Sequence, residues 1–240
     1  MEKFKAIPNS HIIIVAILPL ILNILITPMI IISITSLEEF LKSPFYYTYM
    51  YGPILWSIYH IFLTSLVYYF LKNEGESLKE IIGPFKNKIW LLIIIIISLI
   101  GLSILLFQII EPIMSDVLYG QGMWNQMINE YKRIPLTLAL YSILITPLTA
   151  GICEEIIWRG YLQSRLIHKL RNKIWTAIII QAVLFGLWHS VSIHTLFTAI
   201  FGFIYGLIFI KIKRLIPIMV SHWLSDIIGF SFMYFYPKIL

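Results

Sequence analysis

The chain has 240 residues, of which 59% are apolar and only 12% are charged, and its formal net charge is +6. A soluble domain carries about 25% charged residues, so this composition excludes an ordinary water-exposed globule. The basic residues lie in short loops between apolar runs, a pattern typical of membrane topology and not of nucleic-acid binding. We therefore expect a lipid bilayer around the chain and no nucleic-acid partner.

A single integral membrane domain over residues 1–240 is the expected organisation. No Gly/Ser-rich or Pro-rich linker interrupts the chain, and no internal repeat is visible. The basic start at residues 1–5 precedes an apolar run that is too long for the core of a cleavable signal peptide. We expect this run to be retained as a membrane helix. The single cysteine, Cys153, excludes an intrachain disulfide.

Seven apolar runs approach or exceed the length of about 20 residues that a membrane helix needs. They are His11–Thr35, Tyr47–Leu71, Ile89–Ile110, Ile134 to about Ser164, Ile174–His194, Thr195–Ile210 and Leu215–Phe235. The fourth run is too long for a simple span, and Pro135, Pro147 and Gly151 could kink or divide it. We predict an all-α, polytopic transmembrane bundle of about seven spans, within a range of six to eight.

Loop charges predict the orientation of these spans. Alternate sides of a seven-span chain carry 14 and 4 Lys and Arg residues, and the richer side includes the N-terminus. This count treats Arg159 and Arg165 as part of the loop after the fourth run. The positive-inside rule then places the N-terminus in the cytoplasm and the C-terminus outside.

Ionisable residues inside the apolar runs gather in the second half of the chain. A charge at bilayer depth costs at least about 2.5–3.5 kcal/mol on insertion scales, so such residues are candidates for function. Asn23, His60 and Gln108 are isolated in the first half, and we expect them to form interhelical hydrogen bonds. The candidate catalytic set is Glu154, Glu155, Arg159, His189, His222 and Asp226.

Helical spacing separates the roles of these residues. Glu155 and Arg159 are i,i+4 and share a helix face, so they can pair, and a carboxylate paired with arginine is a poor proton acceptor. Glu154 is turned by about 100° on a 3.6-residue helix and escapes that partner, which favours it as a general base. His222 and Asp226 are also i,i+4 and can pair.

The depth of His189 sets a constraint on the fifth helix. Counted from Lys173 at 1.5 Å per residue, His189 lies about 24 Å inside the bilayer, deeper than the other candidates. We expect this helix to start outside the bilayer, to tilt, or to be followed by a re-entrant segment around Ser190–Thr195.

Three motifs occur in order along the second half of the chain. Residues 154–159 (Glu-Glu-Ile-Ile-Trp-Arg) match EExxxR, residues 185–189 match FxxxH, and residues 222–226 match HxxxN/D. Together they resemble the CPBP family, which comprises the type II CAAX prenyl proteases and the bacteriocin-processing or immunity proteins called Abi. The resemblance covers roughly Ile134–Phe235. It implies a catalytic core at 134–235, with 1–133 forming peripheral membrane spans.

The resemblance implies an intramembrane glutamic endopeptidase with no covalent intermediate, no cofactor and no metal. By that analogy, Glu154 and His189 activate a water that attacks the scissile carbonyl. Glu155 and Arg159 orient these groups. Peptide hydrolysis does require a base near the water and hydrogen-bond donors where negative charge develops.

The last motif position departs from the prenyl-protease pattern, which has Asn there. By the resemblance, His222 and the residue at position 226 stabilise the oxyanion, but an ionised Asp226 cannot donate a hydrogen bond. We expect Asp226 to work ionised, fixing His222 in one tautomer or keeping it protonated. The alternative is a protonated Asp226 that donates to the oxyanion.

The expected substrate is a membrane-embedded or lipidated peptide or protein tail. Prenylated CAAX tails, peptide pheromones, bacteriocin precursors and other membrane proteins all remain open. The isoleucine-rich composition favours an AT-rich prokaryotic genome. We therefore expect a multi-pass protein in the cell membrane of a bacterium or archaeon.

Other functions also fit parts of the pattern. Glu154, His189 and His222 form a two-His, one-carboxylate set that could hold Zn²⁺, although no H-E-x-x-H motif is present. A cysteine mechanism would use Cys153. The non-enzymatic alternatives are an immunity factor, a scaffold, a transporter, or a polar cluster that only holds helices in register.

Overall fold

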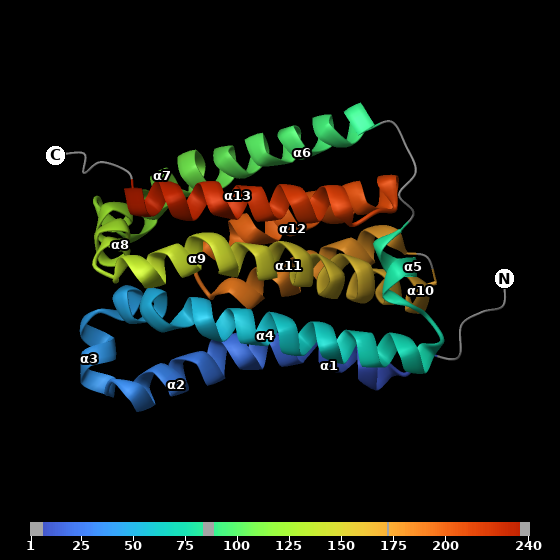
Figure 1. Ribbon diagram of the computed structural model, residues 1–240, viewed down its shortest axis with the longest axis horizontal. Helices are drawn as coiled ribbons and strands as arrows, with labels where there is room; N and C mark the ends of the chain where they lie inside the picture. Colours follow the sequence, from blue (N-terminus) through green and yellow to red (C-terminus); the bar gives the residue numbers. More distant parts are fainter. Residues whose placement is uncertain (1–6, 84–88, 172, 236–240) are drawn as a thin grey trace.

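The computed structural model describes residues 7–83, 89–171 and 173–235, and Figure 1 shows their helices side by side in a bundle. Lys3, Lys5, Lys86, Lys88 and Lys238, which entered the loop-charge count, lie outside the described residues. Within those residues the secondary structure is helical, without strands, so the predicted all-α class is confirmed.

Six helices of the described chain are long and apolar enough to cross a membrane, and a seventh, Ile174–His189, is apolar but shorter. The six are Asn9–Ile34, Pro44–Glu74, Ile89–Tyr119, Leu136–Lys169, Ile193–Ile212 and Ile216–Phe235. The protein is therefore a multi-pass membrane protein, with a span number inside the predicted range.

Several spans are built from more than one helical element. The elements are α1 (Asn9–Leu20), η1 (Ile21–Ile26), α2 (Thr27–Ile34), α3 (Leu37–Lys42), α4 (Pro44–Glu74), α5 (Leu78–Ile82), α6 (Ile89–Ile104), η2 (Leu105–Ile110), α7 (Glu111–Tyr119), α8 (Met123–Lys132), α9 (Leu136–Thr149), η3 (Ala150–Gln163), α10 (Ser164–Lys169), α11 (Ile174–His189), α12 (Ile193–Ile212) and α13 (Ile216–Phe235). The η elements are π-helices, whose backbone hydrogen bonds reach five residues along the chain.

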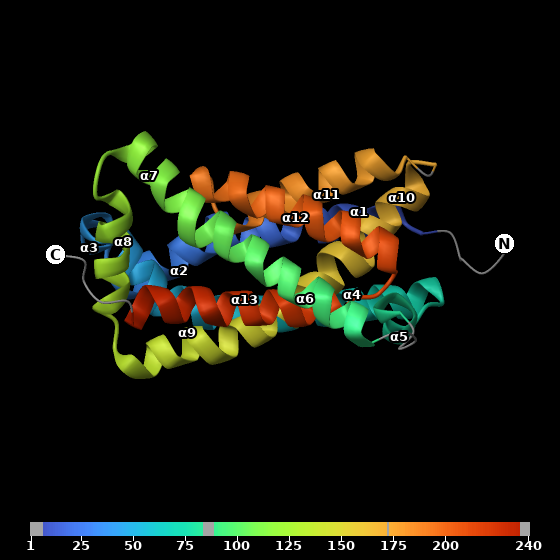
Figure 2. The same ribbon diagram turned by 90° about the horizontal axis from the view of Figure 1, so that it is seen from above.

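The bundle has two distinguishable ends. In Figures 1 and 2, α5 and α10 lie at the end where α1 begins, and α3 and α8 lie at the opposite end, where α13 finishes. We call these the α5/α10 end and the α3/α8 end. Since α1 starts at one end and α13 finishes at the other, the chain makes an odd number of passes, as the seven-span prediction requires.

Three predicted helix bounds were wrong. The third span continues through α7 to Tyr119 instead of stopping at Ile110, and the fourth ends at Lys169 instead of about Ser164. Of the two outcomes left open for the fourth run, a division at Pro147 is not seen, since the helix runs unbroken from Leu136. The fifth ends at His189, not at His194, which belongs to α12. Continuous hydropathy hid this break, because the turn at Ser190–Ser192 joins two apolar helices.

The hairpin of α11 and α12 turns back before it reaches the α3/α8 end (Figures 1 and 2). At 1.5 Å per residue, the 16 residues of α11 span only about 24 Å, less than a hydrocarbon core of about 30 Å. A Cβ at Gly186 would lie 2.5 Å from the carbonyl oxygen of Thr195, so the two helices are in close contact. This turn agrees with the third expected alternative, a chain that turns back around Ser190–Thr195.

The π-helix η3 lies at the centre of the bundle, and nearly all of its residues are buried. It contacts α4, α9, α11, α12 and α13. A Cβ at Gly151 would lie 2.8 Å from the backbone nitrogen of Trp223, so only glycine permits this approach of α13. The close contact brings His222 beside the two glutamates of η3.

A buried ionic cluster ties the helices together toward the α5/α10 end. Glu74 of α4 accepts hydrogen bonds from Tyr161 Oη at 2.6 Å and from Arg165 Nε and Nη2 at 2.9 and 2.8 Å, and its Oε1 lies 2.8 Å from His11 Nδ1. Arg165 and Arg159 are therefore not loop residues. Without them the basic counts are 12 and 4, and the predicted orientation is unchanged.

Candidate active site

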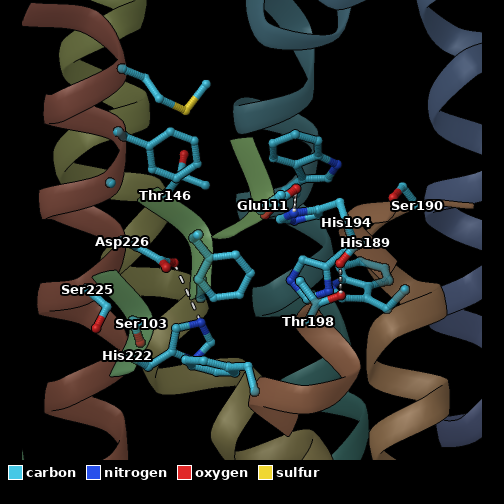
Figure 3. A pocket seen from close by; sticks show the side chains of 18 of the residues that line it. Ser103, Glu111, Thr146, His189, Ser190, His194, Thr198, His222, Ser225 and Asp226 are labelled. Atoms are coloured by element: carbon cyan, nitrogen blue, oxygen red, sulfur yellow. Dashed lines mark hydrogen bonds and ion pairs between the residues drawn. The ribbon is translucent and has the colours of Figure 1, made fainter. Parts of the chain in front are cut away.

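A cavity of about 350 Å³ lies between the helices (Figure 3), and Ala150 and Glu154 of η3 are among its lining residues. Its ionisable lining residues come from α4, α7, η3, α11, α12 and α13. They are His60, Glu111, Glu154, His189, His194, His222 and Asp226. Four of the six predicted site residues thus line one cavity, and Glu155 and Arg159 lie directly behind it.

The two carboxylate oxygens of Glu154 have different surroundings. Its Oε1 is 2.8 Å from His60 Nε2 and accepts a hydrogen bond from Trp188 Nε1 at 3.1 Å. Its Oε2 is buried and has no hydrogen-bond partner among the described residues. This oxygen lies 3.9 Å from Nε2 of His189 and 3.9 Å from Nε2 of His222. One carboxylate oxygen is held, and the other lies between two imidazoles.

The predicted pair of Glu155 and Arg159 is present and fully buried. Arg159 Nη1 donates to Glu155 Oε1 at 3.0 Å. The guanidinium carbon lies 4.2 Å from the ring centroid of Phe185, a cation–π contact that stabilises the buried charge. Glu155 Oε1 also lies 2.8 Å from Nδ1 of His222. The pair therefore connects η3 to α13 and orients an imidazole of the cavity.

His189, at the last position of α11, has a defined tautomer. Its Nδ1 lies 2.8 Å from the carbonyl oxygen of Phe185, and because a carbonyl only accepts, Nδ1 carries the hydrogen. When the ring is neutral, Nε2 is then an acceptor directed toward Glu154. Asn23 donates to the carbonyl oxygen of Trp188 and accepts from Trp56 Nε1 at 2.7 Å, so it holds the end of α11.

Asp226 lies at a more open part of the cavity. Its Oδ2 is 3.6 Å from Nε2 of His222, beyond hydrogen-bond distance, and its side chain is 31% exposed (Figure 3). Nδ1 of His222 already has Glu155 as its partner. Glu155, and not Asp226, is therefore placed to fix the tautomer of His222. Asp226 is an anionic neighbour of the other ring nitrogen, Nε2.

Two of the cavity's polar contacts were missed by the sequence analysis. His60 forms the expected interhelical hydrogen bond, but its partner is Glu154, the predicted base. Glu111 and His194, joined at 2.8 Å between Oε1 and Nδ1, point toward one another in Figure 3. Glu111 lies one residue beyond the predicted end of the third span at Ile110, and Pro112 follows it. Extending the apolar run past this proline would have placed Glu111 inside a span.

Gln108 and Cys153, the remaining polar or reactive residues considered from the sequence, are not part of the cluster around Glu154. Gln108 lines it, and its buried Oε1 has no hydrogen-bond partner within the described chain. Cys153 is buried and is not one of the described lining residues. Over residues 7–83, 89–171 and 173–235, no group of three or more His, Cys, Asp and Glu side chains has an arrangement that could hold a metal ion.

Comparison with known proteins identifies a family for part of the chain. Residues 135–228 match the family described as Type II CAAX prenyl endopeptidase Rce1-like. The matched segment contains all six predicted site residues and confirms the family resemblance expected from their motifs. A search of curated proteins and a search of solved structures found no match.

Proposed function

We propose that this chain hydrolyses a peptide bond inside the membrane with water activated by Glu154 and His189. Its residues 135–228 match the Rce1-like family of type II CAAX prenyl endopeptidases. One observation carries the proposal. The buried, unpartnered Oε2 of Glu154 lies 3.9 Å from Nε2 of both His189 and His222, at the inner end of the cavity. In this reading, residues 134–235 form the catalytic core and residues 1–133 form peripheral spans, one of which supplies His60.

The first step is attack by water. Two atoms 3.9 Å apart can be bridged by one water that lies about 2.8 Å from each, so Glu154 Oε2 and His189 Nε2 suit the same water. The water oxygen forms a bond to the scissile carbonyl carbon as one proton moves to Glu154. The π electron pair of the carbonyl moves onto its oxygen and forms an oxyanion.

His222 is placed to stabilise the oxyanion. Glu155 holds its Nδ1, and Arg159 in turn holds Glu155, so the Nε2 side of the ring faces the cavity. When protonated, Nε2 donates to the developing negative charge, and the carboxylate of Asp226 attracts the imidazolium. The C–N bond then breaks, and the proton held by Glu154 passes to the leaving amine. The products are a carboxylic acid and an amine.

The shape of the cavity suits a peptide segment. A volume of about 350 Å³ falls within the usual range for small-ligand sites, about 300–1,000 Å³. Aromatic and aliphatic side chains make up much of its lining. The proposed substrate is a membrane-embedded or lipidated peptide or protein tail, such as a CAAX-like tail or a pheromone or bacteriocin precursor. The proposed location is the cell membrane of a bacterium or archaeon.

The test uses detergent-purified protein and a set of candidate peptides, with cleavage followed by mass spectrometry. Glu154→Gln removes the base but keeps its size, and turnover is expected to fall by about 100-fold or more. Glu38→Gln is the matched control, because Glu38 is 78% exposed and lies outside the cavity; its activity is expected to equal wild type. Substantial turnover in Glu154→Gln would rule out Glu154 as the base.

Two further outcomes of this experiment separate the alternatives. Turnover is expected to be unchanged in a strong chelator; loss in chelator with recovery on Zn²⁺ addition would favour a zinc-dependent protease. If the wild-type protein cleaves none of the peptides, including membrane-anchored ones, the non-enzymatic immunity or scaffold role is favoured.

A further inference from the structure

Glu111 of α7 is a buried carboxylate that the proposed mechanism does not use. Its side chain is 5% exposed, and its Oε1 lies 2.8 Å from Nδ1 of His194, near the start of α12. Glu111 belongs to the third span, outside the segment that matches the protease family. A carboxylate inside a membrane span is costly and is therefore a candidate for function. Both members of this pair line the cavity that holds Glu154.

The pair leaves one ring nitrogen of His194 available to the cavity. An ionised carboxylate only accepts, so Nδ1 carries the hydrogen that Glu111 binds. Nε2 has no hydrogen-bond partner within the described chain, and the His194 side chain is 39% exposed. When the ring is protonated, it forms an ion pair with Glu111, and Nε2 becomes a donor. His194 is thus an imidazole fixed at one nitrogen and free at the other.

His194 is a neighbour of His189 in the cavity. The centroids of the two rings are 5.8 Å apart, and the side chains lie close together where α11 meets α12 (Figure 3). An extended peptide advances about 3.3–3.6 Å per residue. If the scissile carbonyl lies at Glu154 and His189, then His194 lies beside a peptide group about one or two residues further along the substrate.

The cavity wall around His194 is aromatic. The ring centroid of Phe107 is 5.6 Å from that of His194 and 5.8 Å from that of Phe201. A peptide carbonyl that enters such surroundings loses its hydrogen bonds to water, and it stays unpaired unless the protein offers a donor. Nε2 of His194 can supply that donor beside the scissile bond.

A purely structural link between α7 and α12 accounts for less of this geometry. Such a link exists already, because Tyr119 Oη accepts a hydrogen bond from the backbone nitrogen of Ile193 at 2.9 Å. A structural link needs neither a free ring nitrogen nor exposure to the cavity. His194 has both.

We propose that His194 is a substrate-binding residue whose Nε2 donates to a backbone carbonyl about one or two residues from the scissile bond, with Glu111 as its positioning residue. The inference rests on the proposed protease function and narrows its substrate class. The group that His194 binds is an uncharged carbonyl and not a terminal carboxylate, because Glu111 and Asp226 are already acidic groups of this cavity. The substrate is therefore an extended segment that needs no free C-terminus at this position.

The first arm of the test measures binding by protein that cannot cleave. Every variant carries Glu154→Gln and Glu111→Gln, so that no change at His194 leaves a buried carboxylate unpaired. In this parent protein, His194→Gln keeps an amide nitrogen near the position of Nε2, whereas His194→Asn keeps one only near Nδ1. Each immobilised protein is incubated with a pool of ten-residue peptides, randomised among Ala, Val, Leu and Ser, with acetylated and amidated ends. Mass spectrometry quantifies the peptide that each protein retains.

His194→Asn is expected to weaken binding about 10-fold and His194→Gln by less than about threefold, because only the first removes the donor to the substrate. Gln126→Asn is the matched control and should bind like the parent, because Gln126 is exposed on α8 and is not among the described lining residues. Binding by His194→Asn that is as tight as binding by His194→Gln would overturn the inference. A parent protein that retains no peptide would count against any peptide site in this cavity.

The second arm measures cleavage of the same pool by protein in which Glu154 and Glu111 are intact. His194→Asn is expected to raise KM about 10-fold with a smaller fall in kcat, because it weakens substrate binding and leaves Glu154 and His189 in place. A wild-type KM in an active His194→Asn protein would overturn the inference and leave the protease function standing. The expected order of binding without any cleavage by wild type would instead support the peptide site and count against the protease function.

Discussion

His60 Nε2 and Glu154 Oε1 lie 2.8 Å apart, although 94 positions separate the two residues in the chain. Both side chains are almost completely buried, and the other ring nitrogen of His60 lies 3.1 Å from Thr149 Oγ1. The contact joins α4, outside the segment that matches the protease family, to the π-helix that carries the proposed base. It holds one oxygen of Glu154 so that the other faces His189.

His60→Ala is expected to lower kcat more than it raises KM, because its main effect is to free the carboxylate of Glu154 to rotate, although the His60 side chain also lines the cavity. A hydrogen bond to a charged group contributes about 1.5–3 kcal/mol, so the expected loss is roughly 10- to 100-fold. His60→Gln, which can still donate to Oε1, should restore part of kcat. An unchanged kcat in His60→Ala would contradict the positioning role. If His60 has a purely structural role, His60→Ala should lower the melting temperature, and His60→Gln should not restore kcat.

Arg159→Ala is expected to destabilise the protein and abolish turnover, because it leaves Glu155 as an unpaired buried charge. Breaking a buried ion pair from one side costs roughly 3–5 kcal/mol. Thermal unfolding in detergent measures the effect, and adding Glu155→Gln to Arg159→Ala should recover much of the stability but not the activity. Lys42→Ala, which breaks the exposed pair with Glu38, is the control and should unfold like wild type. A fully stable Arg159→Ala protein would mean that the pair is not buried.

Gly151→Ala is expected to reduce activity by moving α13 away from η3. The added Cβ would lie 2.8 Å from Trp223 N and 2.9 Å from the carbonyl oxygen of Met219, so backbone must shift, at about 1–3 kcal/mol. The shift lengthens the contact between His222 and Glu155. Gly101→Ala is the matched control: nothing in the described structure lies within 4 Å of its added Cβ, and it should be as active as wild type and at least as stable. Equal activity in the two variants would show that the close contact is not required.

Asp226→Asn is expected to lower turnover strongly, because it removes the negative charge that faces Nε2 of His222 at 3.6 Å. Activity is measured across neutral and alkaline pH, with Asp226→Ala for comparison. If the charge is what matters, Asn and Ala should be similarly impaired. An Asn variant that matches or exceeds wild type above neutral pH would instead establish position 226 as a hydrogen-bond donor to the oxyanion.

The sequence by itself determined the membrane class, most of the spans and the members of the polar set. Hydropathy and loop charge are local properties, so they can be read without knowing which helices touch. The pair of Glu155 and Arg159 was also predictable, because partners four residues apart on one helix meet whatever surrounds them. The family followed from three short motifs in order, and residues 135–228 bear it out.

Only the tertiary structure decided how these residues are combined. In a membrane protein, lipid-facing and protein-facing surfaces are both apolar, so hydropathy does not reveal which helix faces meet. The partners of Glu154 and His222 depend on those faces. His60 reaches Glu154 from α4, and Glu155 lies against Nδ1 of His222, whose tautomer Asp226 was expected to fix. The turn around Ser190–Thr195 was one of three alternatives in the sequence analysis, and the exact end of α11 at His189 came only from the structure, because the turn joins two mainly apolar helices.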